Sequence, residues 1–232
     1  SPAYGGSIEG LTVKHIKHAF LTHLHSDHSA GYPDLILSPW TLDRDEALEV
    51  YGPEGIIEMT EAILKAYGED IKYRVYGSEP TNNDGWRVNA HAIQEGIVYE
   101  DDNIKVEAFR VKHGSWPNAF GYRFTTPDRV IVISGDTALD ENVEKYSKGV
   151  DILIHEVYSV AGLSKRTEFW KNYHSNNHTS AHEVGEMASR VKPGLLVLTH
   201  MLFFGTTEEE LLAEVKQKYS GNVVMANDLD VF

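Results

Sequence analysis

The motif HLHSDH, which runs from His23 to His28, constrains this chain more than any other stretch. The apolar run at residues 19–22 precedes it and predicts a short buried strand, and a loop that opens a helical turn is expected to follow. In an extended segment side chains alternate between faces, so His23 and His25 would point the same way. Asp27 and His28 could then turn toward a second point nearby. Imidazole and carboxylate ligands suit zinc or a similar divalent ion, whereas a chance histidine-rich loop would not place four ligands directly behind a strand.

Length and composition limit the classes of protein that this chain can form. Its 232 residues are sufficient for one domain, residues 1–232, with a large core. The absence of any run of eighteen apolar residues predicts a soluble protein with no membrane span. The chain has no cysteine, which excludes disulfides, thiolate zinc sites and a cysteine nucleophile but leaves the compartment open, cytoplasmic or exported. It starts at Ser1 without a methionine or a signal peptide, as a processed or trimmed product would.

The charge balance bears on possible partners. The 35 Asp and Glu residues outnumber the 21 Lys and Arg residues, for a net charge of −14. Proteins that bind nucleic acid usually neutralise phosphates with Lys and Arg. Extended contact with RNA or DNA is therefore disfavoured, although a local basic patch would be compatible with an acidic average. A homodimer is one option for the oligomeric state.

Apolar segments that end in a His, Asp or Glu recur along the chain. The residues at the ends of these segments are His113, Asp136, the pair His155-Glu156 and His200. Loops at one edge of a sheet would bring such residues together, as an active site requires. Residues 69–103 look irregular apart from weak strands at 87–93. The predicted strands are 34–39, 48–51, 104–111, 120–124, 129–134, 151–154, 194–199 and 222–225, and the predicted helices are 52–68, 180–191 and one that begins at 206 or 207 with a capping box.

These residues resemble the metallo-β-lactamase superfamily of hydrolases. The superfamily's HxHxDH signature stands here as the motif from His23 to His28. The later ligands follow in order, with His113 in Val-Lys-His-Gly, Asp136 in Ser-Gly-Asp-Thr and His200 in Leu-Thr-His. The resemblance implies an α+β fold, a four-layer αβ/βα sandwich with a two-metal site along one edge.

The resemblance also implies a ligand set. One ion would be held by His23, His25 and His113, a second by Asp27, His28 and His200, and Asp136 would bridge them. Two divalent ions are thus expected, zinc first, with manganese or iron also compatible.

Within the superfamily, the ribonuclease Z and arylsulfatase-like branch is the most similar. Residues 116–124, 155–158 and 178–180 resemble its GYRF-type strand and its HEAT and HST motifs. In that branch a glutamate and a histidine act as a pair near the leaving group, which here implies Glu156 and His178. Asp27 would ligate a metal and also orient the attacking water. The chain departs from the family in two ways: only 22 residues separate His113 from Asp136, too few for a long tRNA-binding arm, and the family's first strands are expected before residue 1 and are missing.

The implied reaction is hydrolysis by water activated between two ions, with His178 protonating the leaving group. Phosphodiester and sulfate ester are the preferred bonds, a small-molecule ester the preferred substrate, and no membrane partner is expected. The alternatives are tRNA 3′ processing of the ribonuclease Z type, lactone or β-lactam hydrolysis, a non-catalytic metal-binding protein and a di-iron protein. Among the remaining histidines, His155 is expected in the core or behind the ligands, His91 at the surface and His174 in an aromatic loop.

Overall fold

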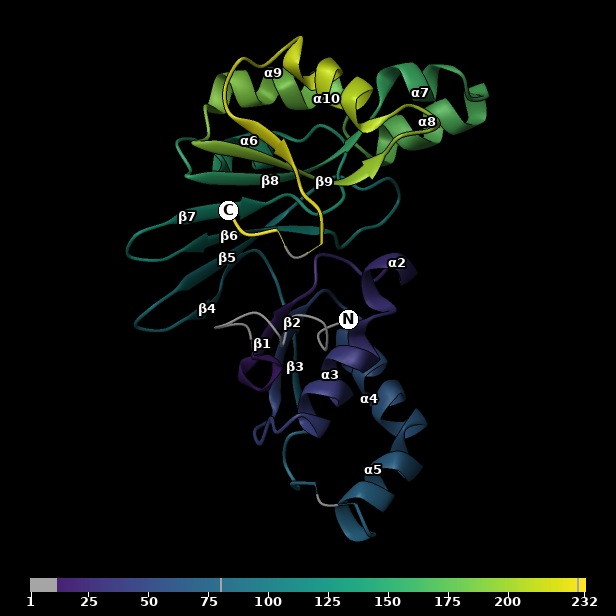
Figure 1. Ribbon diagram of the computed structural model, residues 1–232, viewed down its shortest axis with the longest axis vertical. Coiled ribbons are helices and arrows are strands. Elements are labelled where there is room, and N and C mark those ends of the chain that lie inside the picture. Colours follow the sequence, from purple (N-terminus) through teal and green to yellow (C-terminus); the bar gives the residue numbers. More distant parts are fainter. Residues whose placement is uncertain (1–11, 80, 229) are drawn as a thin grey trace. The chain divides into compact units, whose positions relative to one another are not determined.

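The computed structural model describes residues 12–79, 81–228 and 230–232, and the chain forms two compact units that divide after Ile93 (Figure 1). The predicted single domain over residues 1–232 stays a prediction. Ser1, where the chain starts, lies outside the described residues. In the part of the chain that is described, every helix is too short or too polar to cross a membrane.

The first unit is built on a three-stranded parallel sheet in the order β1-β2-β3, where the strands are β1 (His18–Phe20), β2 (Leu48–Gly52) and β3 (Val88–Ala92). Its helices are the 3-10 turn η1 (Val13–His15), α2 (Ser26–Ser29), α3 (Tyr32–Thr41), α4 (Ile56–Ala66) and α5 (Gly68–Tyr76). Leu48 and Val50 of the central strand β2 are fully buried and pack against Ile36 and Ile56 of the helices. The predicted strands at 48–51 and 87–93 are confirmed.

Two predictions in this unit were wrong. Residues 34–39 belong to helix α3 and not to a strand, because Tyr32, Ile36 and Trp40 recur every four residues and are all almost fully buried. Pro33 in the first turn suits a helix start, since its missing N–H has no partner there anyway. Residues predicted as irregular after 68 instead form α5, a mostly exposed helix that sequence periodicity signals weakly because it buries only Ile71.

The second unit contains a seven-stranded sheet in the order β10-β9-β8-β7-β6-β5-β4. Strands β4 to β7 pair antiparallel, and β7 to β10 pair parallel. The strands are β4 (Gly96–Glu100), β5 (Lys105–Arg110), β6 (Phe120–Thr125), β7 (Val130–Ile133), β8 (Ile152–Tyr158), β9 (Leu195–Leu202) and β10 (Val223–Met225), and the helices are α6 (Glu141–Tyr146), α7 (Val160–Ser164), α8 (Glu168–Asn177), α9 (Ala181–Val191) and α10 (Glu208–Lys216).

Helices α9 and α10 pack against each other on one side of this sheet (Figure 1). The predicted capping box is present, Thr207 with Glu210, and α9 begins with a second one, Ser180 with Glu183. Helix α9 buries Val184, Met187, Ala188 and Val191, one face at helical spacing, and these residues join the core of the unit with Leu153, Leu196 and Leu198 of the sheet.

The predicted strands of this unit are confirmed, but two of them continue past the predicted ends. Strand β8 runs through Glu156 to Tyr158, and β9 runs through His200 to Leu202. The sequence analysis did not predict β4, α6, α7 or α8. Helix α8 was predicted as an aromatic and polar loop, because its many Asn and aromatic residues are poor helix formers. Packing of the unit overrides that weak preference.

Candidate metal centre

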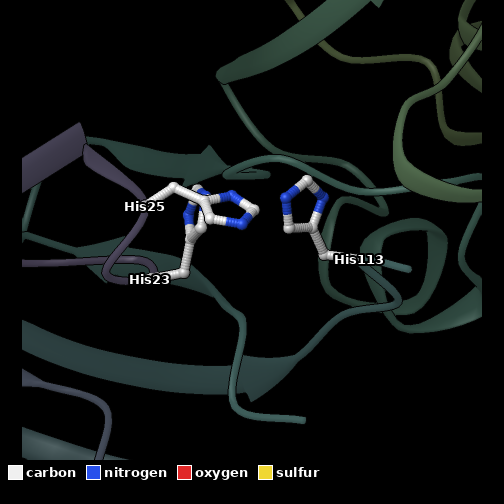
Figure 2. A group of neighbouring side chains, drawn as sticks. All are labelled: His23, His25 and His113. Carbon is white, nitrogen blue, oxygen red and sulfur yellow. The ribbon is translucent and has the colours of Figure 1, made fainter. Parts of the chain in front are cut away.

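In the first unit, the histidine motif directly follows the first strand. Strand β1 ends at Phe20, and His23 and His25 lie in the irregular segment before α2. Nε2 of His23 lies 3.0 Å from Nδ1 of His25, and the two rings lie side by side in Figure 2. Two imidazole nitrogens bound to one ion at about 2.0–2.1 Å are roughly 2.9–3.4 Å apart. The spacing therefore fits a shared metal ion, although the alternation of a strand does not produce it.

Asp27 and His28 lie on the short helix α2 that follows. The ring of His28 is centred 4.2 Å from the ring of His23, and Nε2 of His28 lies 3.6 Å from Oδ2 of Asp27. The hydroxyl of Ser29 donates to the carbonyl oxygen of His25 over 2.9 Å and holds this turn closed. All four residues of the predicted motif thus gather within the first unit.

His113 lies in the second unit, just beyond β5, and is buried. Its Nδ1 donates to the carbonyl oxygen of Asn177 at the end of α8 over 2.8 Å, so Nε2 is the nitrogen that a metal would take. The next residue, Gly114, donates its N–H to the carbonyl oxygen of Asn176 and has φ +54°, in the left-handed region. The last turn of α8 therefore orients His113.

Gly114→Ala is expected to weaken metal binding by about 10- to 100-fold, the usual effect of losing a partner that orients a ligand. A Cβ at this position would collide with the side-chain amide of Asn177, so the loop would have to leave the end of α8. Gly149→Ala is the matched control, because Gly149 also has positive φ but a Cβ there would meet nothing within 4 Å. The measurement is metal affinity by competition with a chromophoric chelator. Equal affinities for the two variants would contradict this role of α8.

Asp136, His178 and His200 also come together in the second unit. Oδ2 of Asp136 lies 3.6 Å from Nε2 of His200 and 3.9 Å from Nδ1 of His178. The rings of His178 and His200 stack with their centroids 5.6 Å apart and 15° between their planes. These three side chains offer ligand atoms close enough to hold an ion. His178 is the residue that ends helix α8, so the same helix positions both His113 and His178.

His200 is placed by an irregularity in β9. Glu156 of β8 pairs with Thr199 and Val157 pairs with Met201, so His200 is an extra residue between two paired positions. Its φ of +45° is unusual for a residue with a side chain. A bulge of this kind turns a side chain out of the regular alternation of the strand. Such strain costs about 1–3 kcal/mol and is concentrated at functional sites.

Glu156 is a buried carboxylate of β8 held by the backbone. Its Oε1 accepts hydrogen bonds from the N–H groups of Thr137 and Thr179, each over 3.1 Å, and lies 3.3 Å from Nδ1 of His178. Burial, and then the charge of Asp136, raises the pKa of Glu156 well above its usual range. A cation bound at Asp136 would relieve that repulsion, so the charges of the donor set, like its spacing, fit a metal ion.

The remaining histidines divide as follows. His155 is buried in the core at β8, donates from Nδ1 to the carbonyl oxygen of Glu156 over 2.6 Å, and has a pKa lowered to about 4 by burial. The prediction that His155 lies in the core or behind the ligands is thus confirmed. His91 is at the surface as predicted but pairs with Glu49, Nε2 to Oε2 over 2.7 Å. His174 lies on helix α8 and not in a loop, which the four-residue spacing of Trp170, His174 and His178, close to one helical turn, could have indicated.

Three comparisons with known proteins show the family to which the chain belongs. The family model described as the β-lactamase superfamily domain matches residues 4–201. A protein named ribonuclease Z from Mycobacterium sp. (strain KMS) is 30% identical over 83% of this chain and 68% of its own length. Another from Mycobacterium bovis is 28% identical over 95% of this chain and 80% of its own length.

Solved structures share the fold. The metallo-β-lactamase fold protein YhfI from Bacillus subtilis has a TM-score of 0.68 at 20% identity, covering 94% of this chain and 78% of that one. Human tRNase Z, short form, has a TM-score of 0.66 at 21% identity, covering 96% and 81%. The chain therefore belongs to the metallo-β-lactamase superfamily of metal-dependent hydrolases, in its ribonuclease Z branch. The predicted metallo-β-lactamase fold and the predicted class of enzyme are confirmed.

Proposed function

We propose that this enzyme hydrolyses phosphodiesters at a centre of two divalent ions. Zinc is the preferred ion, and manganese or iron would also be compatible with the ligands. One ion would be held by His23, His25 and His113. The other would be held by Asp27, His28 and His200, with Asp136 as the shared ligand. Support comes from the donor types, from the 3.0 Å separation of the facing nitrogens of His23 and His25, and from the family to which the chain belongs. Such ions supply a nucleophile at neutral pH and stabilise charge that develops on the ester oxygens.

The proposal gives the protein's own groups distinct tasks. Asp27, more exposed than the other ligands, orients the attacking water toward phosphorus. His178 carries the proton that the leaving oxygen takes when its bond to phosphorus breaks. Glu156 is a positioning residue, since the N–H groups of Thr137 and Thr179 hold its Oε1 in place beside Nδ1 of His178.

The observation that carries the proposal is the buried group of Asp136, Glu156 and His178. His178 lies between a proposed ligand and a carboxylate that is itself fixed by two backbone N–H groups. A protein that only stored or scaffolded metal would have no use for a histidine held in this way. Titratable groups arranged with shifted pKa values beside a metal-binding cluster are typical of hydrolytic sites.

A substrate panel tests the reaction. Bis-p-nitrophenyl phosphate, p-nitrophenyl sulfate, a lactone and a β-lactam are compared after dialysis against a chelator and reloading with Zn²⁺ or Mn²⁺. We expect kcat/KM for the phosphodiester to exceed that for each other substrate by about 100-fold or more, and to vanish without metal. Turnover restricted to the sulfate ester or the lactone would refute the phosphodiester assignment.

A second candidate is tRNA 3′ processing, favoured by the 30% identity to proteins named ribonuclease Z. The net charge of −14 and the short segment between His113 and Asp136 instead favour a small substrate. A precursor tRNA in the same panel at physiological salt separates the two. Efficient tRNA cleavage with the small ester left intact would establish the second candidate.

A further inference from the structure

The backbone of the segment that carries His113 leaves the sheet just before that residue. The regular pairing of β5 with β6 ends at Arg110. One more bond follows, from the N–H of Val111 to the carbonyl oxygen of Ala119, which lies just before β6. The N–H and the carbonyl oxygen of Lys112 lie beyond this ladder and pair with a different segment.

The partner of Lys112 is the loop between β7 and α6, which carries Asp136. The N–H of Ala138 donates to the carbonyl oxygen of Lys112 over 2.7 Å, and the N–H of Lys112 donates to Oδ2 of Asp140 over 3.0 Å. These two hydrogen bonds join the residue directly before His113 to the loop of Asp136. Two proposed metal ligands are therefore connected to each other through the backbone.

Asp140 also caps helix α6. Its Oδ1 accepts from the N–H of Asn142 over 2.7 Å, the usual bond of an N-cap residue. A cap needs only one oxygen, and a serine or a threonine supplies it at the starts of α7, α9 and α10. Asp140 is only 5% exposed, and burial of a carboxylate is costly unless its oxygens accept hydrogen bonds. Capping uses one of its oxygens, and the N–H of Lys112 uses the other.

The start of α6 contacts the segment at a second place, and α8 holds it from another direction. The side-chain amide of Asn142 donates to the carbonyl oxygen of Arg110 over 3.0 Å. As described above, the ring of His113 and the N–H of Gly114 bond to the last turn of α8. The three consecutive residues 112–114 thus have partners on two segments that are distant from them in the sequence.

We propose that Asp140 is a positioning residue of the metal centre, which holds His113 in place relative to Asp136. The inference rests on the proposed metal centre, because His113 and Asp136 need a fixed separation only as ligands of the same pair of ions. Asp140 is not one of the proposed ligands and acts through the backbone N–H of Lys112. Loss of a residue that orients a ligand usually weakens metal binding by about 10- to 100-fold. Because Asp140 acts through a neighbour of the ligand, we expect about 10-fold.

Asp140→Ser separates the two tasks of this side chain. Serine is as good an N-cap as aspartate but has one oxygen, so the variant should keep α6 and release the N–H of Lys112. The affinity for Zn²⁺, measured by competition with a chromophoric chelator, should fall about 10-fold. The kcat for bis-p-nitrophenyl phosphate should return toward the wild-type value at saturating Zn²⁺, because every proposed ligand is still present.

Amide hydrogen exchange of the metal-free protein gives a readout that does not depend on activity. In the wild type, the N–H of Lys112 bonds to a buried carboxylate and should exchange slowly. In Asp140→Ser it should exchange about 10-fold or more faster, since this bond is lost. The N–H of Gly114 bonds to α8 and should keep its rate.

Two control variants remove comparable bonds elsewhere. Asp101→Ser removes a carboxylate that accepts from two backbone N–H groups in the turn before β5, at the end of that strand remote from the proposed ligands. Asn142→Ala removes the other bond between α6 and the segment, the one to Arg110. Both variants should bind Zn²⁺ as the wild type does.

Asp140→Asn is a second test, in case the serine variant does not fold. Its side chain has the size of aspartate and only one acceptor oxygen, so it can serve only one of the two N–H groups. If asparagine keeps the cap of α6, as its high N-cap preference favours, it should show the same loss of Zn²⁺ affinity and the same fast exchange at Lys112.

The positioning role would be refuted by unchanged Zn²⁺ affinity in Asp140→Ser and Asp140→Asn, by slow exchange at Lys112 in both, or by an equal loss in Asn142→Ala. Normal turnover of the phosphodiester together with unchanged affinity would refute this role and keep the reaction. A wild type that binds Zn²⁺ but hydrolyses no phosphodiester would refute the reaction, and a loss of affinity in Asp140→Ser would then still establish the role of Asp140.

Discussion

Asp136→Ala is expected to lose more than one equivalent of metal and to lower kcat/KM for a phosphodiester by about 10⁴-fold, on the order of 5 kcal/mol of transition-state stabilisation. The reason is that a shared ligand belongs to both ions, so its removal weakens both coordination spheres at once. Asp136 follows β7, is buried, and directs Oδ2 toward Nε2 of His200. The measurements are metal content by mass spectrometry after gel filtration, and steady-state kinetics.

The variant should remain folded, because removing this buried negative charge stabilises the metal-free protein. The charge of Asp136 contributes to raising the pKa of Glu156, so its removal makes the ionised form of Glu156 easier to bury. Asp136→Asn keeps the size of the side chain and should lose metal in the same way. Asp128→Ala, which removes an exposed carboxylate in the turn before β7, is the control and should keep both ions. Two ions retained at wild-type affinity in Asp136→Ala would show that Asp136 does not bridge.

His178→Ala is expected to slow kcat by about 10²–10⁴-fold for esters with poor leaving groups while both ions stay bound. A poor leaving group needs its proton in the transition state, whereas p-nitrophenolate leaves without one. The loss should therefore grow with the pKa of the leaving group, from a small effect on p-nitrophenyl esters to the full effect on alkyl esters. The measurement is kcat for a graded series, with metal content determined on the same samples.

Glu156→Gln should give a weaker form of the same pattern if Glu156 only positions His178. The amide keeps an oxygen that can accept from Thr137 and Thr179, so the backbone contacts survive. His182→Ala, on α9 and outside the cluster, is the matched control and should leave the series unchanged. His178 also has ligand atoms close to those of Asp136 and His200. Loss of an ion from His178→Ala, or an equal loss of rate across the series, would make His178 a ligand or a structural residue.

The sequence by itself determined which residues could carry the chemistry. The motif from His23 to His28 consists of adjacent residues, so local spacing alone was enough to single it out. The strands that precede His113 and Asp136 were also predictable from local patterns, because the first alternates between apolar and polar residues and the second is a continuous apolar run. The capping box at Thr207 was predictable because it joins residues only three positions apart, and the box at Ser180 has the same spacing.

The tertiary structure decided how those residues are held. His200 points out of β9 because a bulge forms opposite β8, a feature of strand pairing that no single segment encodes. Helix α8 forms from residues with weak helical preference, and its last turn orients His113 through a contact between residues 64 positions apart. The hydrogen bond from Lys112 to Asp140 likewise joins two segments 28 positions apart. Such contacts depend on packing between distant segments, and the local pattern of a sequence does not contain them.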